Sequence, residues 1–179
     1  MAANHKKQRL RSDYPFFLSY RTRWSDNDQY AHVNNAIYYH LFDAVVNNYL
    51  IDHCGMDPTK SEQIGLVVSS FCEFFSPVSF PDVLDLGLRV THLGSSSVTY
   101  EVGVFRAKAH TNEDHPASTH LQGKRESNAP DTVIPVAVGG YTHVFVESTS
   151  RKSTPINAQM KSSLKKLMAH TDATAVSKL

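Results

Sequence analysis

The sequence predicts an α+β domain in which one antiparallel sheet packs against one long helix. Between residues 35 and 53 the apolar positions recur at spacings of three and four, as they do along one side of a helix. Several later segments alternate apolar and polar residues with a period of two, which is typical of strands. At 179 residues the chain is long enough to bury a core as a single domain. A sheet lying against a helix is the simplest arrangement that buries both apolar surfaces.

The first two elements are a strand and the long helix. Residues 16–24 are interpreted as a strand, because polar residues alternate with bulky ones from Leu18 onward. Asn34 or Asn35 can cap the helix that follows, and Gly55 stands where a left-handed residue often ends a helix. The apolar stripe of this helix is broad, so we expect the helix to be mostly buried. The stripe consists of Ile37, Tyr38, Leu41, Phe42, Val45, Val46, Tyr49 and Leu50.

The remaining strands follow the helix along the chain. Residues 64–75 are rich in Val and Phe, and they are followed by two prolines. Residues 84–90 and 98–104 alternate, and the turn signal Gly94–Ser96 between them predicts a hairpin. Residues 133–146 supply the last strand. We therefore expect an antiparallel meander of about four strands after the helix.

The domain is predicted to span residues 16–169 and to end in a short amphipathic helix that begins near residue 158. Residues 1–15 are expected to form a flexible tail, residues 111–132 a mobile loop poor in large apolar side chains, and residues 170–179 a frayed end. The N-terminal tail is basic but lacks the apolar stretch of a secretory signal, which favours a cytoplasmic protein. A mitochondrial leader is the alternative interpretation of the same basic segment.

Composition narrows the classes of partner and site. Eighteen basic and seventeen acidic residues give a formal net charge of +1, so no nucleic-acid partner is indicated, and no apolar run is long enough for a membrane span. Cys54 and Cys72 lack the spacing of metal or redox motifs, and buried reduced thiols are expected. His110, His115 and His120 lie in the predicted loop without cysteines or carboxylates to complete a metal site. The sequence therefore predicts no metal.

The segment directly before the long helix concentrates the polar residues most suited to chemistry. It reads Trp-Ser-Asp-Asn-Asp-Gln-Tyr-Ala-His-Val-Asn-Asn over residues 24–35. The segment brings a carboxylate close to the first amides of a helix, which point outward without partners and carry the positive end of the helix dipole. A base beside such amides suits the hydrolysis of an activated acyl group.

Residues 24–38 resemble the active-site turn of the hotdog-fold acyl-CoA thioesterases of the 4-hydroxybenzoyl-CoA thioesterase type. In that family a D-x-D turn, often continued as H-V-N-N, leads into the central helix. The matching positions are Asp26, Asp28, His32, Val33, Asn34, Asn35 and Tyr38. The family often has glycine where this chain has Ala31. The likeness extends over residues 16–168 and implies the hotdog fold, an antiparallel β-sheet curled around one long central α-helix.

The resemblance implies a role for several residues of the turn. Asp28 matches the family's catalytic acid and is expected to act as a general base or as a nucleophile. The amides near Asn34 and Asn35 are expected to polarise the thioester carbonyl. His32 either contacts Asp28 or the substrate, or packs as an ordinary histidine. Asp26 is interpreted as a turn former, and the same plain structural role is the alternative for Asp28.

The resemblance also implies substrate contacts and an assembly. The aromatic residues Tyr38, Phe42, Phe71 and Phe75 are expected to line a tunnel or to lie in the core. The hairpin residues Arg89, His92, Ser96 and Ser97 are expected to contact coenzyme A, although serines in a hairpin are more often turn residues. Coenzyme A enters as part of the substrate, and no cofactor is implied. Members of this fold assemble as homodimers or homotetramers with the acyl site at the subunit boundary, which also covers a sheet edge.

The leading hypothesis is therefore an acyl-CoA thioesterase that releases a free acid and coenzyme A. The same scaffold can release acyl chains from acyl carrier protein. A non-catalytic hotdog protein that binds acyl-CoA or lipid is an alternative from another class. A dehydratase or hydratase is the remaining alternative, and the D-x-D-x-x-x-H-V-N-N run argues against it.

Overall fold

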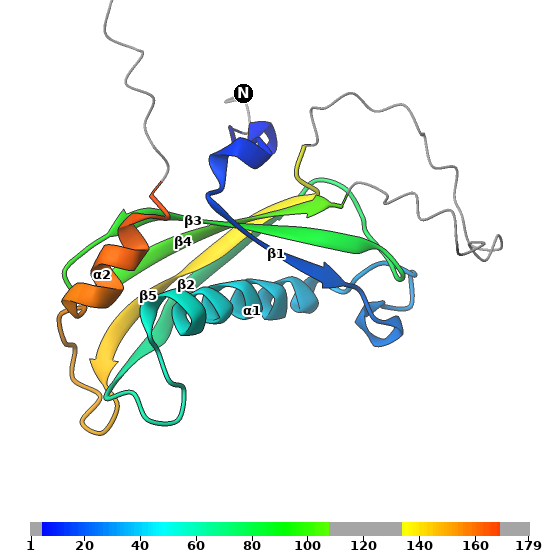
Figure 1. Cartoon of the computed structure of the whole chain (residues 1–179). Coiled ribbons are helices and arrows are strands. Elements are labelled where there is room, and N and C mark those ends of the chain that lie inside the picture. The colour runs from blue at the N-terminus through cyan, green and yellow to red at the C-terminus, as the bar shows by residue number, and fades with distance from the viewer. Residues whose placement is uncertain (1–4, 108–133, 169–179) are drawn as a thin grey trace, which may run out of the picture.

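The computed structural model describes residues 5–107 and 134–168, which form a five-stranded antiparallel sheet with a long helix against one face (Figure 1). The predicted α+β architecture is confirmed. The strands and main helices are β1 (Phe16–Arg21), α1 (Asn35–Cys54), β2 (Gln63–Phe74), β3 (Val83–Leu93), β4 (Ser97–Arg106), β5 (Ala137–Glu147) and α2 (Ala158–Lys165). Short 3-10 turns lie at His5–Gln8, Arg11–Asp13 and Trp24–Asp26.

The order of strands across the sheet is β1-β3-β4-β5-β2. The predicted hairpin is present as β3 and β4, and β5 continues the meander by pairing with β4. β2 does not pair with β3 as a simple meander requires; it lies at the far edge and pairs with β5. Period-two alternation fixes which side chains share a face of the sheet, but it does not fix which strand is the neighbour. The meander prediction was therefore wrong for β2 and right for the hairpin.

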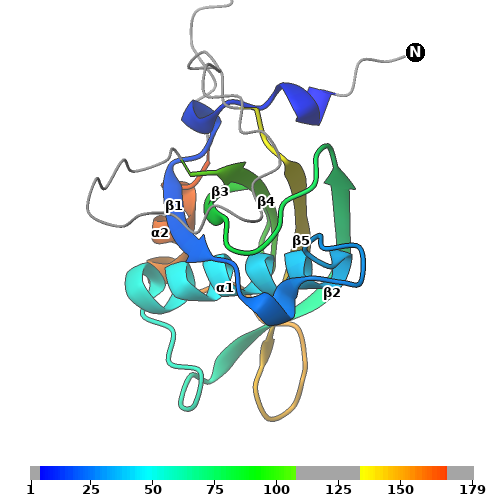
Figure 2. The ribbon, with the colours of Figure 1, turned by 90° about the vertical axis from the view of Figure 1, so that its right-hand side faces the viewer.

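The core lies between α1 and the inner face of the sheet. The predicted apolar stripe of α1 supplies most of the helix side of the core. Of that stripe, only Ile37 is half-buried and the other residues are buried. Alternate positions of β3 and β4 supply the other side, and these are Leu84, Leu86, Leu88, Val90, Val98, Tyr100, Val102 and Val104. Gly139 of β5 lets the helix approach the sheet, because a Cβ atom there would lie 2.4 Å from the ring of Phe42. Figure 2 shows the sheet curving around this helix.

Both ends of α1 are formed as the sequence predicts. The side chain of Asn34 accepts a hydrogen bond from the amide of Ala36 and caps the start. Gly55 follows the end with φ of 71°, the left-handed conformation that glycine adopts without a steric cost. The first turn of α1 is thereby held in place, and the candidate site is built on it.

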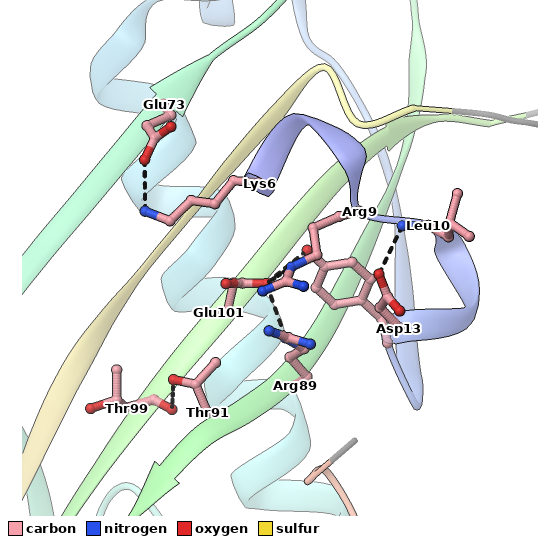
Figure 3. A network of polar contacts seen from close by, with 10 residues as sticks. Lys6, Arg9, Leu10, Asp13, Glu73, Arg89, Thr91, Thr99 and Glu101 are labelled. Carbon is pink, nitrogen blue, oxygen red and sulfur yellow. Dashed lines mark hydrogen bonds and ion pairs between the residues drawn. The ribbon is translucent and has the colours of Figure 1, made fainter. Parts of the chain in front are cut away.

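The segment before β1 lies on the outer face of the sheet, opposite α1 (Figure 1). The ring of Tyr14 lies over a pair of facing glycines, Gly87 and Gly103, where a Cβ atom would approach the ring to 2.8 Å and 2.6 Å. The buried carboxylate of Glu101 accepts hydrogen bonds from the Tyr14 hydroxyl and the Arg9 guanidinium, and it pairs with Arg89 at 2.9 Å (Figure 3). A flexible tail was predicted over residues 1–15, whereas residues 5–14 make these packed contacts.

Some sequence predictions fall outside the described residues. These are the first four residues of the tail, the loop over residues 111–132 with its histidines, and the end over residues 170–179. Within the described ranges, no helix is long and apolar enough to cross a membrane. Cys54 is buried and Cys72 half-buried, both as free thiols, and burial raises their pKa values to about 11 and about 12.

Candidate active site at the start of α1

The predicted turn and the first residues of α1 line one cavity of about 310 Å³. Four of the predicted site residues contribute to it, together with a wall in which Phe75 alone was among the expected tunnel positions. The lining consists of Asp28, His32, Val33, Asn35, Tyr38, Phe74, Phe75, Ser76 and Pro77. The cavity therefore brings the turn before α1 next to the end of β2, which is some forty residues later in the chain.

Asp28 uses one of its carboxylate oxygens to stabilise the turn. Its Oδ1 accepts hydrogen bonds from the amides of Tyr30 at 2.8 Å and His32 at 3.3 Å. Its own amide donates to the His32 carbonyl at 2.8 Å, which closes the turn on itself. Among the described residues Oδ2 has no hydrogen-bond partner, and the side chain lines the cavity. Asp28 thus combines a structural contact through one oxygen with a second oxygen that is free for chemistry.

Asp26 has a different environment from Asp28. Its side chain is 1 % exposed and accepts hydrogen bonds from the Tyr20 hydroxyl at 2.9 Å and the Arg23 amide at 2.7 Å, and it pairs with the Arg23 guanidinium. Its carbonyl accepts the amide of Asn34 at 2.9 Å. Asp26 therefore anchors the turn to β1 and fixes where α1 begins, which agrees with its interpretation as a turn former.

The first amides of α1 are not all occupied. The Ala36 amide donates to the Asn34 side chain at 2.9 Å, and the Ile37 amide donates to the Asn34 carbonyl at 2.9 Å. The Asn35 amide has no partner in the part of the chain that the structure describes, and Asn35 lines the cavity. This amide is the available donor at the positive end of the helix dipole. Asn34 itself acts as the helix cap and is not part of the cavity lining.

His32 and Ala31 complete the turn. His32 is exposed and lines the cavity next to Asp28. Ala31 has φ of 61°, a conformation in which glycine carries no Cβ penalty and alanine is strained by about 1 kcal/mol. The position where the related motif often has glycine therefore does require left-handed backbone in this chain.

The opposite wall is formed by the end of β2 and the segment that follows it. Phe74 packs edge-to-face on Tyr38, with ring centroids 5.0 Å apart. The Val33 amide donates to the Val78 carbonyl at 2.7 Å, which connects this segment to the turn. Burial raises the pKa of Tyr38 to about 12, so its hydroxyl stays protonated in the neutral range. Tyr38 therefore lines the cavity and is also part of the hydrophobic core.

The predicted coenzyme A contacts lie elsewhere in the chain. Arg89 is on the outer face, where it pairs with Glu101. His92, Ser96 and Ser97 lie around the β3–β4 hairpin, and the Ser96 carbonyl accepts the Phe145 amide. The hairpin is at the start of β4, whereas the cavity is near its end, and the 10 residues of this strand span roughly 30 Å. One chain alone does not bring these residues to Asp28, and their role in binding stays a prediction.

A second cavity of about 650 Å³ lies at the other end of α1. Its lining includes Cys54, Gln63 and Lys152 and none of the predicted site residues. In the described ranges no three His, Cys, Asp or Glu side chains are grouped so that they could hold a metal ion. The candidate site is therefore the smaller cavity, where a carboxylate oxygen and a helix amide are both free.

Known proteins resemble this chain in sequence and in fold. The model of the thioesterase superfamily matches residues 30–112, which begin after Asp28 and include the second half of the turn, α1 and the wall. The PA5185 protein from Pseudomonas aeruginosa is 40 % identical, with a TM-score of 0.74 over 90 % of this chain and 96 % of that protein. The chain belongs to the thioesterase superfamily. The hotdog fold implied by the motif is confirmed, and the protein is a thioester hydrolase.

Two solved structures of lower sequence identity share the fold. A 1,4-dihydroxy-2-naphthoyl-CoA thioesterase from Synechocystis is 15 % identical, with a TM-score of 0.65 over 85 % of this chain and 96 % of that one. A thioesterase from Thermus thermophilus, solved with coenzyme A and Zn, is 17 % identical, with a TM-score of 0.60 over 85 % and 98 % of the two chains. A comparison with curated protein sequences finds no match.

Proposed function

We propose that this superfamily member hydrolyses acyl-CoA thioesters, with Asp28 as base or nucleophile and the Asn35 amide as the oxyanion donor. The observation that carries the proposal is the juxtaposition in one cavity of two unoccupied groups, the Asp28 Oδ2 atom and the Asn35 amide. Hydrolysis requires an attacking oxygen and a donor for the charge that develops on the carbonyl oxygen. The cavity offers one group of each kind.

The reaction has two possible first steps from this arrangement. In one, the Asp28 carboxylate takes a proton from water while the water oxygen attacks the thioester carbonyl, and the tetrahedral intermediate then breaks its C–S bond and releases the thiolate of coenzyme A. In the other, the carboxylate attacks directly, the thiolate of coenzyme A leaves, and water then hydrolyses the anhydride. In both, the Asn35 amide and the helix dipole stabilise the negative carbonyl oxygen. This chemistry needs no metal and no cofactor besides the coenzyme A of the substrate.

Coenzyme A thioesters are proposed as substrates because of two superfamily members. The Synechocystis protein is named as a thioesterase of an aromatic acyl-CoA, and the Thermus protein was crystallised with coenzyme A. Three aromatic residues, Tyr38, Phe74 and Phe75, are in the lining of the cavity, and the rings of Tyr38 and Phe74 pack edge-to-face. These rings suit an acyl group that is buried while the thioester reaches the start of α1.

We also propose a homodimer or homotetramer with the acyl site at a subunit boundary. β2 is an edge strand of 12 residues, and within the described part of the chain it pairs on one side only, with β5. Leu66, Val67 and Val68 of this strand are exposed, at 37 %, 52 % and 60 %. A long apolar edge of this kind is commonly covered by another chain. Contacts from the β3–β4 hairpin to coenzyme A would then come from a second subunit.

The experiment is a substrate panel read by release of free thiol. Aliphatic and aromatic acyl-CoA compounds and the same acyl groups on acyl carrier protein are tested with the wild-type enzyme and Asp28→Asn. We expect turnover of acyl-CoA by the wild type and its near loss in the variant. Turnover of the carrier-protein substrates alone would show that the acyl group is carried by acyl carrier protein and not by coenzyme A. Binding without turnover anywhere in the panel, or hydration of an enoyl-CoA, would reject the proposed reaction.

A further inference from the structure

The inner face of β4 ends in a charged residue. Its inward positions Val98, Tyr100, Val102 and Val104 are buried in the core, and the next position with the same orientation is Arg106. Arg106 pairs with Leu84 of β3, another inward position, so the alternation continues without a bulge. A guanidinium therefore stands on the α1 side of the sheet, at the end of the strand that lies nearest the cavity.

Arg106 contacts the wall of the cavity but does not line the cavity itself. One of its terminal nitrogens donates to the Pro77 carbonyl, and its Nε lies 3.6 Å from Asp82 Oδ2. Pro77 lines the cavity directly, next to Phe75 and Ser76. The positive charge also acts on Tyr38, where burial and the Cys72 thiol raise the hydroxyl pKa and Arg106 lowers it. Arg106 thus lies close to the lining without being part of it.

Among the described residues, few other hydrogen bonds connect the backbone of the wall to the rest of the protein. The amides of Phe75 and Ser76 donate to the Val136 carbonyl, at 2.8 Å and 3.1 Å. Farther along, the Thr22 hydroxyl donates to the carbonyls of Ser79 and Asp82. Between these attachments, the Arg106 contact to Pro77 and the Val33 contact to Val78 hold the segment against the site.

We propose that Arg106 is a positioning residue that sets the Phe75–Pro77 wall and thereby the fit of the acyl group. This inference rests on the proposed function. The guanidinium has a fork of donors, so it serves a carbonyl and a carboxylate at once, which an ammonium group does less well. Loss of the guanidinium contacts to Pro77 and Asp82 loosens the wall and changes how the acyl group is bound. The positions of the Asp28 carboxylate and the Asn35 amide do not depend on these contacts.

The test compares Arg106→Met and Arg106→Lys with the wild type. The control is Lys165→Met, which removes a positive charge from an exposed position of α2. Each protein is assayed on an acyl-CoA and on the N-acetylcysteamine thioester of the same acyl group, which lacks the nucleotide and its phosphates. We expect KM to rise about tenfold in Arg106→Met on both substrates and about threefold in Arg106→Lys, with kcat changed less than about twofold.

Three outcomes would overturn the inference. An unchanged KM shows that the wall does not depend on Arg106. A rise confined to the acyl-CoA shows that the guanidinium binds the phosphates of coenzyme A. A fall in kcat at constant KM assigns Arg106 to the chemical step. If Arg106→Met does not fold, Arg106→Lys decides alone, since it keeps the charge. A wild type inactive on both substrates would instead reject the proposed function itself.

Discussion

The Asp28 carboxylate is joined to the backbone amide of Tyr30 by a hydrogen bond of 2.8 Å through its Oδ1 atom. The contact orients the side chain within its own turn, so the second oxygen does not have to be ordered by a substrate. An Asx turn is usually a structural feature only. In this chain the same turn also directs a carboxylate into a cavity, and the structural and catalytic interpretations of Asp28 are compatible.

Replacement of Asp28 by Asn separates these two roles. The amide oxygen of Asn still accepts from Tyr30, so the turn and the melting temperature should be retained, while the base is lost. We expect kcat to fall about 10²- to 10⁴-fold, the usual contribution of a general base. The matched control is Asp52→Asn at an exposed position of α1, where the carboxylate accepts a hydrogen bond from the side chain of Asn48. Equal rates for Asp28→Asn and the control would exclude a catalytic role for Asp28.

The oxyanion donor can be removed without shortening the helix. Asn35 is the first residue of α1, where proline is well tolerated because the amide has no partner within the helix. Asn34 has φ of −59° and ψ of 139°, which suits a residue before proline. We expect Asn35→Pro to lower kcat about 10²- to 10³-fold, as the loss of one oxyanion donor does elsewhere.

Asn35→Ala is the control for that substitution, since it keeps the amide and removes only the side chain. Circular dichroism of both variants shows whether the helix is intact. Similar activity of Asn35→Pro and Asn35→Ala would mean that another group stabilises the carbonyl oxygen.

Local patterns in the sequence predicted the elements and the candidate turn but, apart from Phe75, not the wall of the cavity. The helix, its cap at Asn34 and the hairpin all depend on residues close together in the chain. The wall depends on the pairing of β2 with β5, which places Phe74 beside Tyr38. Such pairing joins segments that are far apart in sequence, and alternation gives no information about it.

The outer-face contacts were missed for a different reason. Residues 5–14 contain several basic side chains, and their composition resembles that of a solvated tail. Their partner is Glu101, a carboxylate in an otherwise apolar strand, and the notch for Tyr14 is made by Gly87 and Gly103. The glutamate and the paired glycines were visible signals that the outer face of the sheet is covered, although they did not indicate by which segment.

The buried carboxylate of Asp26 should matter for stability more than for chemistry. Asp26→Asn places an amide group beside the Tyr20 hydroxyl and the Arg23 amide, and one of these contacts is lost. We expect the free energy of unfolding to decrease by about 2–3 kcal/mol, since the contacts are to a buried charged group. Chemical denaturation measures the change, and Asp28→Asn is the control that should leave stability nearly unaltered. A similar loss in both variants would contradict this distinction.

The covering of the outer face can be tested at a glycine. A Cβ atom at Gly103 would lie 2.6 Å from Tyr14, so Gly103→Ala should displace the ring and loosen residues 5–14. We expect this variant to be destabilised and to be cleaved by trypsin faster at Arg9 and Arg11. In a Tyr14→Ala background the same substitution should cost less, because the clash is absent. Additive effects of the two substitutions would show that Tyr14 does not occupy this notch in solution.

Stability should depend on pH through a buried histidine in β5. Burial lowers the pKa of His143 from 6.5 to about 4, and the side chain is 4 % exposed. The unfolded chain therefore binds a proton between pH 6.5 and pH 4 that the folded protein does not, so stability decreases as the pH falls through this window. The contribution of His143 to this loss should reach about 3 kcal/mol near pH 4.

Denaturation of the wild type and His143→Leu across this pH range gives the contribution of His143 as the difference between the two slopes. Carboxylates that titrate in the same range contribute to both proteins and cancel in that difference. Leucine is a suitable replacement, since the Nδ1 atom of His143 has no hydrogen-bond partner in the described structure. His40→Gln, at an exposed position of α1, should behave as the wild type. Parallel slopes for the wild type and His143→Leu would show that His143 is protonated in the folded protein or is accessible to water.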